Sequence, residues 1–199
     1  MARDQTDLSR WDIGPISESG LDDPQEPVAP LPPARLPVAA PRNSAAVIPI
    51  VEHYSPGLAD FVWVGAHGGS GVSSLATVSG EGLELSQMWP APALGWPRSV
   101  ALVCRTSASG LDDAARFLHA WAAHAVPGVD VVALVTVADS PVRLPKTLRT
   151  RIHELSGVVP TTFNVPWIPA WREVPRAPDK SVLRTAAAVR ALATKENHP

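Results

Sequence analysis

The sequence predicts an α/β fold of three layers with a mostly parallel sheet. An N-terminal arm precedes this domain in the sequence. Short apolar segments typical of buried strands alternate with segments of helical periodicity. A run of glycines also joins the first predicted strand directly to the first predicted helix. Finally, eight of the 22 prolines fall within residues 1–45, which separates a proline-rich arm from the rest of the chain.

Residues 1–45 are expected to form a disordered, acidic, proline-rich arm. They carry seven Asp or Glu and four Arg, with too little apolar surface to offset the entropy cost of ordering. In the simplest interpretation the arm is a solvated tail. In the alternative, Leu8, Trp11 and Ile13 form a short motif that docks on a protein partner. Residues 46–199 are enough for one domain with a buried core.

The strands and helices of this domain follow from the spacing of its apolar residues. Segment 129–138 is apolar almost throughout, as in parallel strands covered on both faces. In segment 111–125 apolar residues recur at helical spacing, which predicts one buried helix face. The Trp- and Pro-rich segment 166–178 is expected to be irregular. By the same reasoning we expect strands over 58–64, 99–104, 129–138 and 158–165, and helices beginning at 72 and over 111–125, 144–155 and 181–195.

The glycine run between the first strand and the first helix is the main functional signal. Such a loop places a group of backbone N–H donors at the positive end of a helix, and this arrangement suits a phosphate group. The usual phosphate loop, G-x-x-x-x-G-K-[ST], adds a lysine for the terminal phosphates and a hydroxyl for Mg²⁺. Here Val72 stands in the lysine position, and Ser73 keeps the hydroxyl. The candidate phosphate-binding residues are Gly65, His67, Gly68, Gly69, Ser70, Gly71, Val72, Ser73 and Ser74.

The segment His67-Gly-Gly-Ser-Gly-Val-Ser-Ser74 resembles the deviant phosphate loop of ParA/MinD-like ATPases, K-G-G-x-G-K-[ST]-[ST], with His67 and Val72 in place of the two lysines. The resemblance continues through the predicted strands at 100–104 and 131–139. It implies an abbreviated sheet of the P-loop NTPase type, because the stretch between Thr77 and Trp96 is too short for the family's two switch regions. The chain also resembles short lysine-less P-loop-like proteins in mobile elements of high-GC bacteria.

Loss of both lysines removes the fixed positive charge on which phosphoryl transfer depends. We therefore expect a non-catalytic or weakly nucleotide-binding interaction module, with ATP or GTP and Mg²⁺ held weakly or no cofactor at all. The resemblance adds a role accessory to DNA partitioning, transfer or secretion. The alternative is an ATPase or GTPase that takes a cation from a partner. If the loop geometry is intact, Val72→Lys should strengthen triphosphate binding.

Two residues are candidate Mg²⁺ ligands. Ser73 occupies the hydroxyl position of the loop, and Asp139 closes an apolar strand, as in a Walker-B segment. The simpler interpretation of Asp139-Ser-Pro141 is a turn, because Asp is a favoured residue at the start of a turn.

Positive charge gathers in the C-terminal third. Residues 143–199 carry ten basic and four acidic side chains. This surface is a solvated face in the simplest interpretation, or one that attracts DNA phosphates or an acidic protein partner. A membrane is a poor partner, because Ala186–Ala188 gives the last helix little apolar area. A homodimer is compatible with the sequence. The candidate partner or DNA residues are Arg143, Lys146, Arg149 and Arg151.

The remaining signals bound the protein class. Cys104 lies in an apolar strand and is expected to be a buried thiol. No apolar run approaches the roughly 20 residues of a membrane helix, so we expect a cytoplasmic protein. Four tryptophans accompany prolines in loops and are expected to pack those loops or to roof a pocket: Trp89, Trp96, Trp167 and Trp171.

Overall fold

The computed structural model describes residues 47–174 and 176–196. The predicted arm at 1–45, with its docking motif, lies outside the described residues. The described part forms five strands, β1 (Val62–Gly65), β2 (Leu83–Ser86), β3 (Ser99–Arg105), β4 (Asp130–Val137) and β5 (Thr162–Val165). It also forms four α-helices, α1 (Val72–Ser79), α2 (Ala108–Ala122), α3 (Lys146–Ser156) and α4 (Lys180–Glu196), and two 3-10 turns, η1 (Pro92–Leu94) and η2 (Pro169–Arg172).

All five strands run parallel in one sheet, in the order β2-β1-β3-β4-β5. The chain leaves β1 toward one edge to form β2, then returns past β1 to form β3 and continues toward the other edge. The strand order therefore reverses between β1 and β3. Flavodoxin-like sheets share this order, and open α/β sheets bind ligands at such a switch point, outside the carboxyl ends of the strands. The fold thus directs attention to the segments that follow β1 and β3.

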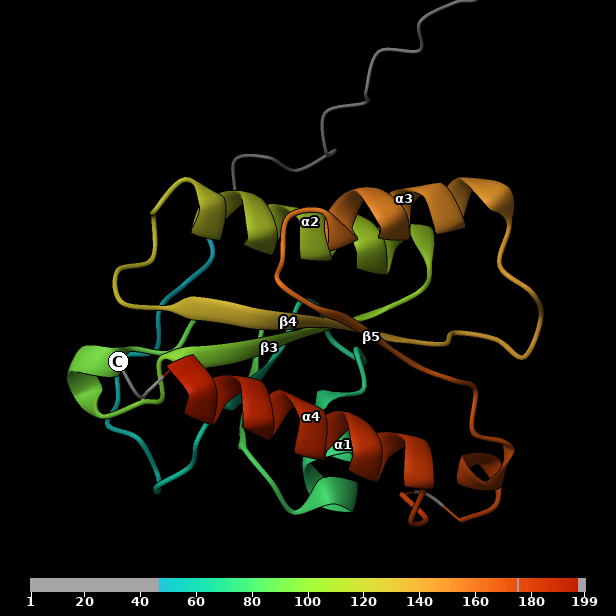
Figure 1. Cartoon of the computed structure of the whole chain (residues 1–199), viewed down its shortest axis with the longest axis horizontal. Helices are drawn as coiled ribbons and strands as arrows, with labels where there is room; N and C mark the ends of the chain where they lie inside the picture. Colours follow the sequence, from blue (N-terminus) through green and yellow to red (C-terminus); the bar gives the residue numbers. More distant parts are fainter. Residues whose placement is uncertain (1–46, 175, 197–199) are drawn as a thin grey trace, which may run out of the picture. The chain divides into compact units, whose positions relative to one another are not determined.

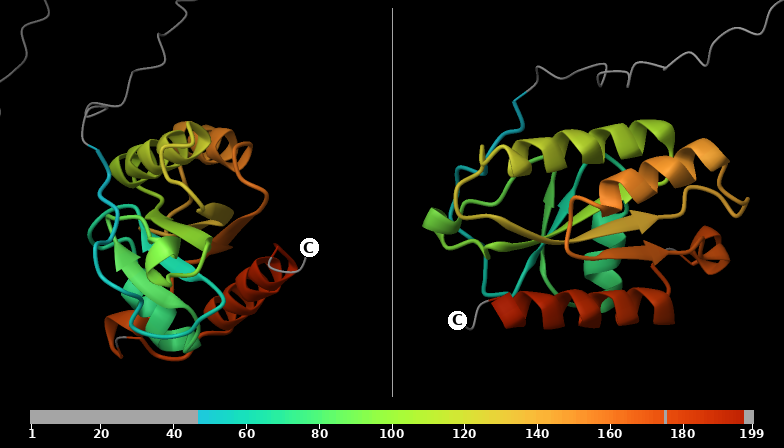
Figure 2. Two further views of the ribbon diagram at one scale, coloured as in Figure 1. Left: turned by 90° about the vertical axis from the view of Figure 1, so that its left-hand side faces the viewer. Right: turned by 45° about the horizontal axis from the view of Figure 1, so that its top comes forward.

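Two helical layers cover the sheet (Figures 1 and 2). Helices α2 and α3 lie on one face, and α1 and α4 lie on the other. The layer under α2 buries Leu111, Phe117 and Leu118 against alternate residues of the central strands. On the opposite face, Val182 and Val189 of α4 are fully buried with Val72 and Leu75 of α1. Because both faces are covered, β3 and β4 are apolar almost throughout.

The segment before β1 is tied to the loop that follows β2. Val51 donates a backbone hydrogen bond to the carbonyl of Trp89, and the indole of Trp96 donates to the carbonyl of His53. Trp89 and Trp96 are both buried, and the ring of Trp89 packs against Phe117. These two tryptophans therefore pack loops, which was one of the two roles expected for them; the other was to roof a pocket.

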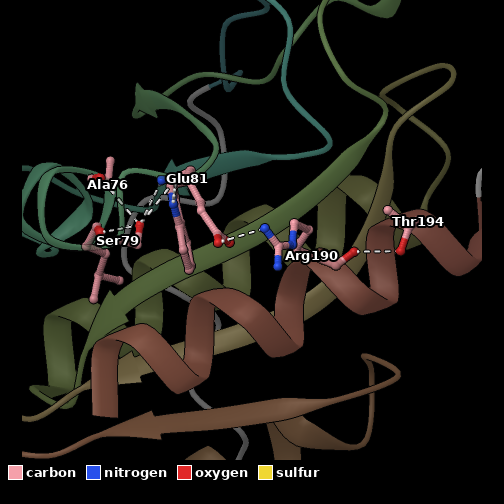
Figure 3. Close-up of polar contacts among 7 residues, drawn as sticks. Ala76, Ser79, Glu81, Arg190 and Thr194 are labelled. Carbon is pink, nitrogen blue, oxygen red and sulfur yellow. Dashed lines mark hydrogen bonds and ion pairs between the residues drawn. The ribbon is translucent and has the colours of Figure 1, made fainter. Parts of the chain in front are cut away.

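An ion pair joins the loop after α1 to α4, which lies on the same face of the sheet as α1 (Figure 3). Arg190 lies 2.9 Å from the carboxylate of Glu81. The backbone around Glu81 is fixed as well, because its carbonyl accepts from the indole of Trp63 and its N–H donates to the hydroxyl of Ser79. This contact adds a polar link between the C-terminal helix and the first βαβ unit.

The predicted alternation of strands and helices is confirmed, and several details differ. The strand β2 is missing from the sequence-based prediction because it is a four-residue edge strand with only Leu85 buried, so it leaves no apolar run. The predicted strand 158–165 is paired only over its last four residues. Helix α2 begins at 108 rather than 111, because the hydroxyl of Ser107 caps it by accepting from the N–H of Gly110.

Candidate functional site

The glycine loop runs from the end of β1 to the start of α1, as the sequence predicts. Gly69 and Gly71 have φ angles of 77° and 102°, a left-handed conformation that favours glycine. Gly65 is required for a different reason: a Cβ there would lie 2.6 Å from the hydroxyl oxygen of the buried Ser70. The loop is thus a tight turn whose shape depends on its glycines.

The start of α1 offers backbone donors. Among the described residues, no acceptor meets the N–H groups of Val72, Ser73 and Ser74, the first three residues of the helix. Such groups carry partial positive charge and suit an anion. Ser73 and Ser74 are both partly exposed, so the helix start is open to solvent.

His67 fastens the loop to the neighbouring strand. Its Nε2 accepts a hydrogen bond from the backbone N–H of Arg105, with a donor–acceptor distance of 3.1 Å. Because Nε2 accepts, the ring proton is on Nδ1, which donates to the carbonyl of Gly68 at 2.9 Å. The imidazole therefore serves as a structural bridge between the loop and the end of β3.

A cation comes instead from the end of β3. The side chain of Arg105 donates from Nε to the carbonyl of Gly69 at 3.0 Å. One terminal nitrogen donates to the carbonyl of Ala138, just beyond β4, also at 3.0 Å. Guanidinium has five N–H donors, and in the described part of the chain no acceptor meets the other three. Arg105 thus lies across the carboxyl ends of the strands with its position fixed and donors to spare.

Beside Arg105 lies a cavity of about 280 Å³. Helix α1 contributes Ser74 to it, the strands contribute Arg105 and Val137, and Ala138 lines it just beyond β4. The segment after β5 forms the rest of the lining, which comprises Pro166, Trp167, Ile168, Trp171, Arg172 and Arg176. The lining thus includes three arginines and two tryptophans, and the structure shows no acidic residue in it. We call this the arginine cavity.

A second, larger cavity of about 480 Å³ lies toward α3. Its lining is polar where the strands end: Thr106 accepts from the N–H of Asp139, and Thr136 contacts the side-chain oxygen of Asn164. Helix α3 contributes Arg149 and His153. The hydroxyl of Thr162, also in this lining, is buried and has no hydrogen-bond partner among the described residues.

The side chain of Val72 does not belong to the loop surface. It is 6% exposed and packs in the apolar cluster between the sheet, α1 and α4. The backbone N–H of Val72 remains available at the helix start. Its side chain, however, points into the apolar core. The expectation that a lysine at 72 would reach the phosphates therefore loses its geometric basis.

The two candidate Mg²⁺ ligands lie on different elements. Ser73 is in the first turn of α1, and Asp139 follows β4 and is exposed. Neither lines the arginine cavity, although their neighbours Ser74 and Ala138 both do. The bend at 139–142 is stabilised by Ser140, whose hydroxyl accepts from the N–H of Val142. Within the described ranges, no group of three or more His, Cys, Asp or Glu side chains could hold a metal ion.

The four candidate partner residues fall into two groups. Arg143, Lys146 and Arg149 are exposed. Arg151 instead lies 3.4 Å from the carboxylate of Asp112 on α2 and 3.4 Å from that of Glu154, so it joins α3 to α2. The first three remain available for a partner, and Arg151 has a structural contact.

Cys104 is buried in the middle of the sheet, as expected. Burial, with a smaller contribution from the charge of Asp113, raises the pKa of its thiol to about 12. The thiol is protonated at neutral pH and unreactive there.

Sequence reasoning missed Arg105 as a site residue, and it counted Arg172 and Arg176 only in the general positive charge of the C-terminal third. A signal for the first was present, because Arg105 closes a predicted apolar strand, and the ends of parallel strands meet at one edge of the sheet. The expectation that loop tryptophans roof a pocket holds for Trp167 and Trp171, which line the cavity.

Comparison with known proteins places the chain in a family. Residues 60–189 match the family of unknown function DUF6668, and the chain belongs to it. The match begins just before β1 and ends within α4, so it includes the glycine loop and the arginine cavity. Neither the curated proteins nor the solved structures gave a match. In the described part of the chain, no helix combines the length and the apolar character needed to cross a membrane.

Proposed function

We propose that this protein is a non-catalytic interaction module that binds a phosphate-bearing ligand at the glycine loop. ATP and GTP are the first ligands to test, given the resemblance of residues 67–74 to ParA/MinD-like loops, and we expect weak binding. One observation carries the proposal: the loop leaves β1 at the switch point of the sheet and ends in a helix start whose N–H groups have no acceptor in the described part of the chain.

Turnover is not part of the proposal, because the chemistry of the loop does not support it. The lysine position is an apolar core residue, Val72, and both ring nitrogens of His67 are used in hydrogen bonds to the backbone. Phosphoryl transfer requires positive charge fixed around the transferred group, and backbone N–H groups alone do not replace it.

A charge placed at the helix start tests this site. Ser73→Glu puts a carboxylate where the anion would lie, while an acidic residue in the first turn is favourable for the helix itself. Thr77→Glu adds the same charge one turn further along α1 at an exposed position and is the matched control. We expect Ser73→Glu to weaken binding of ATP, GTP or pyrophosphate at least about tenfold in calorimetry, and Thr77→Glu to change it little.

Two results would contradict the proposal. Equal affinities of the wild type and Ser73→Glu for these phosphate ligands would show that the helix start is not part of the binding site. Release of inorganic phosphate from ATP or GTP by the protein alone, above the rate with Ser73→Glu, would show catalysis. In that case the alternative, an ATPase or GTPase, would replace the non-catalytic module.

Nonspecific DNA binding is a second candidate function, favoured by the exposure of Arg143, Lys146 and Arg149 around the start of α3. Contacts of this kind depend on salt, because they release counterions from the DNA. Retention on duplex DNA at low salt that is lost in a triple alanine variant of these residues would support it. Retention equal to that of the wild type would exclude this face.

A further inference from the structure

The arginine cavity contains the cations that the glycine loop lacks. Arg105 lies between the loop and the cavity, because it bonds to Gly69 on one side and to Ala138 on the other. Arg172 and Arg176 reach the same cavity from the segment after β5. Three arginines therefore line a space that also borders the first turn of α1 at Ser74.

This charge has no counterpart in the lining. Glu and Asp are absent from the part of the lining that the structure describes, so an anionic ligand would meet cations without competition from a carboxylate. Guanidinium binds phosphate oxygens through paired N–H donors, and Arg105 still has donors available. A phosphate with two charges fits this environment better than a neutral or cationic group does.

The walls of the cavity indicate what the phosphate is attached to. Trp167, Ile168 and Trp171 line it together with Pro166. The indole N–H of Trp171 is already bonded to the carbonyl of Ala177 at 2.8 Å, so its polar edge is satisfied within the chain. The apolar part of that ring is then what a ligand meets, and flat apolar groups stack well on such surfaces.

The size of the cavity narrows the ligand class. Its volume of about 280 Å³ is just below the roughly 300–1,000 Å³ typical of ligand pockets. A small ligand with one phosphate and one ring is therefore favoured over a triphosphate chelated to Mg²⁺. The two candidate Mg²⁺ ligands, Ser73 and Asp139, lie outside the lining, which also favours a ligand that binds without Mg²⁺.

We propose that the arginine cavity is a metal-independent binding site for a phosphomonoester that carries a flat apolar ring, a molecule of the size of a nucleoside monophosphate. Arg105, Arg172 and Arg176 bind its phosphate, and Trp167 and Trp171 contact its ring. This rests on the proposed function in one respect: the phosphate also meets the helix start of the glycine loop, through the first turn that contributes Ser74.

The test is a titration of the full chain with AMP and UMP in the presence of EDTA, in which binding is measured by calorimetry and by tryptophan fluorescence. We expect binding without metal, accompanied by a fluorescence change that is reduced in Trp171→Phe. Arg172→Ala and Arg176→Ala should each weaken binding about tenfold or more, the usual effect of losing a charged hydrogen bond. Arg184→Ala, which removes an exposed arginine of α4 outside the cavity lining, is the matched control and should bind like the wild type.

Three results would overturn the proposal: no binding in EDTA, binding that appears only when Mg²⁺ is added, or affinities that are unchanged in Arg172→Ala and Arg176→Ala. These variants alter exposed residues, so a folding defect is not expected, and circular dichroism checks this.

Comparison with Ser73→Glu separates this proposal from the function proposed above. Binding that tolerates Ser73→Glu but fails in Arg172→Ala would support the arginine cavity and overturn the role of the loop. Binding that fails in Ser73→Glu but tolerates both arginine variants would support the loop and overturn the arginine cavity.

Discussion

The imidazole of His67 and the backbone N–H of Arg105 are joined by a hydrogen bond of 3.1 Å that links the loop after β1 to the end of β3. These are the two strands between which the strand order of the sheet reverses. The side chain of Arg105 adds a second hydrogen bond between the same two segments, because it donates to the carbonyl of Gly69 in the loop. The two residues thus fix the glycine loop and the end of β3 relative to each other, and the candidate site depends on both.

Replacement of His67 should loosen this connection. In His67→Ala the N–H of Arg105 loses its acceptor, and we expect the free energy of unfolding to fall by about 1 kcal/mol. Chemical denaturation measures this loss, and hydrogen exchange should show faster exchange of the Arg105 amide. His119→Ala, at an exposed position on α2, is the control. An unchanged exchange rate at Arg105 in His67→Ala would contradict the bridge.

Gly110 is the next point at which the same junction can be tested. A Cβ at this position would lie 2.6 Å from the carbonyl oxygen of Arg105 and 2.9 Å from Nε2 of His67. We expect Gly110→Ala to lower the free energy of unfolding by about 1–3 kcal/mol, because backbone must move to relieve the contact. Gly57→Ala, where nothing lies within 4 Å, should leave stability almost unchanged. Equal effects of the two variants in thermal unfolding would show that the junction is looser than described.

A lysine at position 72 should damage the domain without restoring a phosphate contact. Val72 packs in the apolar cluster with Leu75, so an ammonium group there would lose its hydration or force the side chain out of the core. We expect Val72→Lys to cost about 2 kcal/mol or more in urea denaturation, with no gain in affinity for ATP. Val142→Lys, at a position that is 73% exposed, is the control. Tighter ATP binding by a stable Val72→Lys protein would show that the side chain reaches the loop.

The cap of α4 gives a prediction that depends on pH. Asp179 accepts hydrogen bonds from the side chain and backbone of Ser181 and from the backbone of Val182, and these lower its pKa from the ordinary value of 3.8. A lowered pKa in the folded state means that the carboxylate contributes stability above about pH 4 and that this contribution is lost as the pH falls through the folded-state pKa.

Asp179→Ala should therefore cost about 1 kcal/mol at neutral pH, and the difference from the wild type should shrink on acidification below pH 3.8. Urea denaturation at a series of pH values measures both quantities. A difference that stays constant from pH 7 to pH 2 would show that the charge of Asp179 is not what stabilises the start of α4. The exposed carboxylate of Glu173 offers a matched control in Glu173→Ala.

The parts of the fold that could be predicted are those whose signal is local. Strand β4 and helix α2 bury long regular patterns, so apolar spacing alone reveals them. Strand β2 could not be found in this way, because its pairing with β1 at the edge of the sheet, rather than its own apolar content, makes it a strand. The predicted start of the fourth strand was too early because Val158 is in the turn after α3.

The candidate site divides along the same line. The strand-loop-helix geometry of residues 62–79 was predictable, since glycine spacing is a local signal. The fixed position of Arg105 was not, because it comes from carbonyls of Gly69 and Ala138, which are far apart in the sequence. Similarly, the bridging position of His67 depends on a hydrogen bond between the loop after β1 and the end of β3, and the burial of Val72 depends on how α1 packs beside α4.

The protected thiol of Cys104 makes the chain a convenient substrate for site-specific labelling. It is the one cysteine of the sequence, and with its pKa near 12 it will not compete for maleimide reagents at neutral pH. A cysteine introduced at an exposed position such as Thr77 can therefore carry a fluorophore or a spin label in an otherwise native background, and the signal of that label can follow α1 as ligands are added.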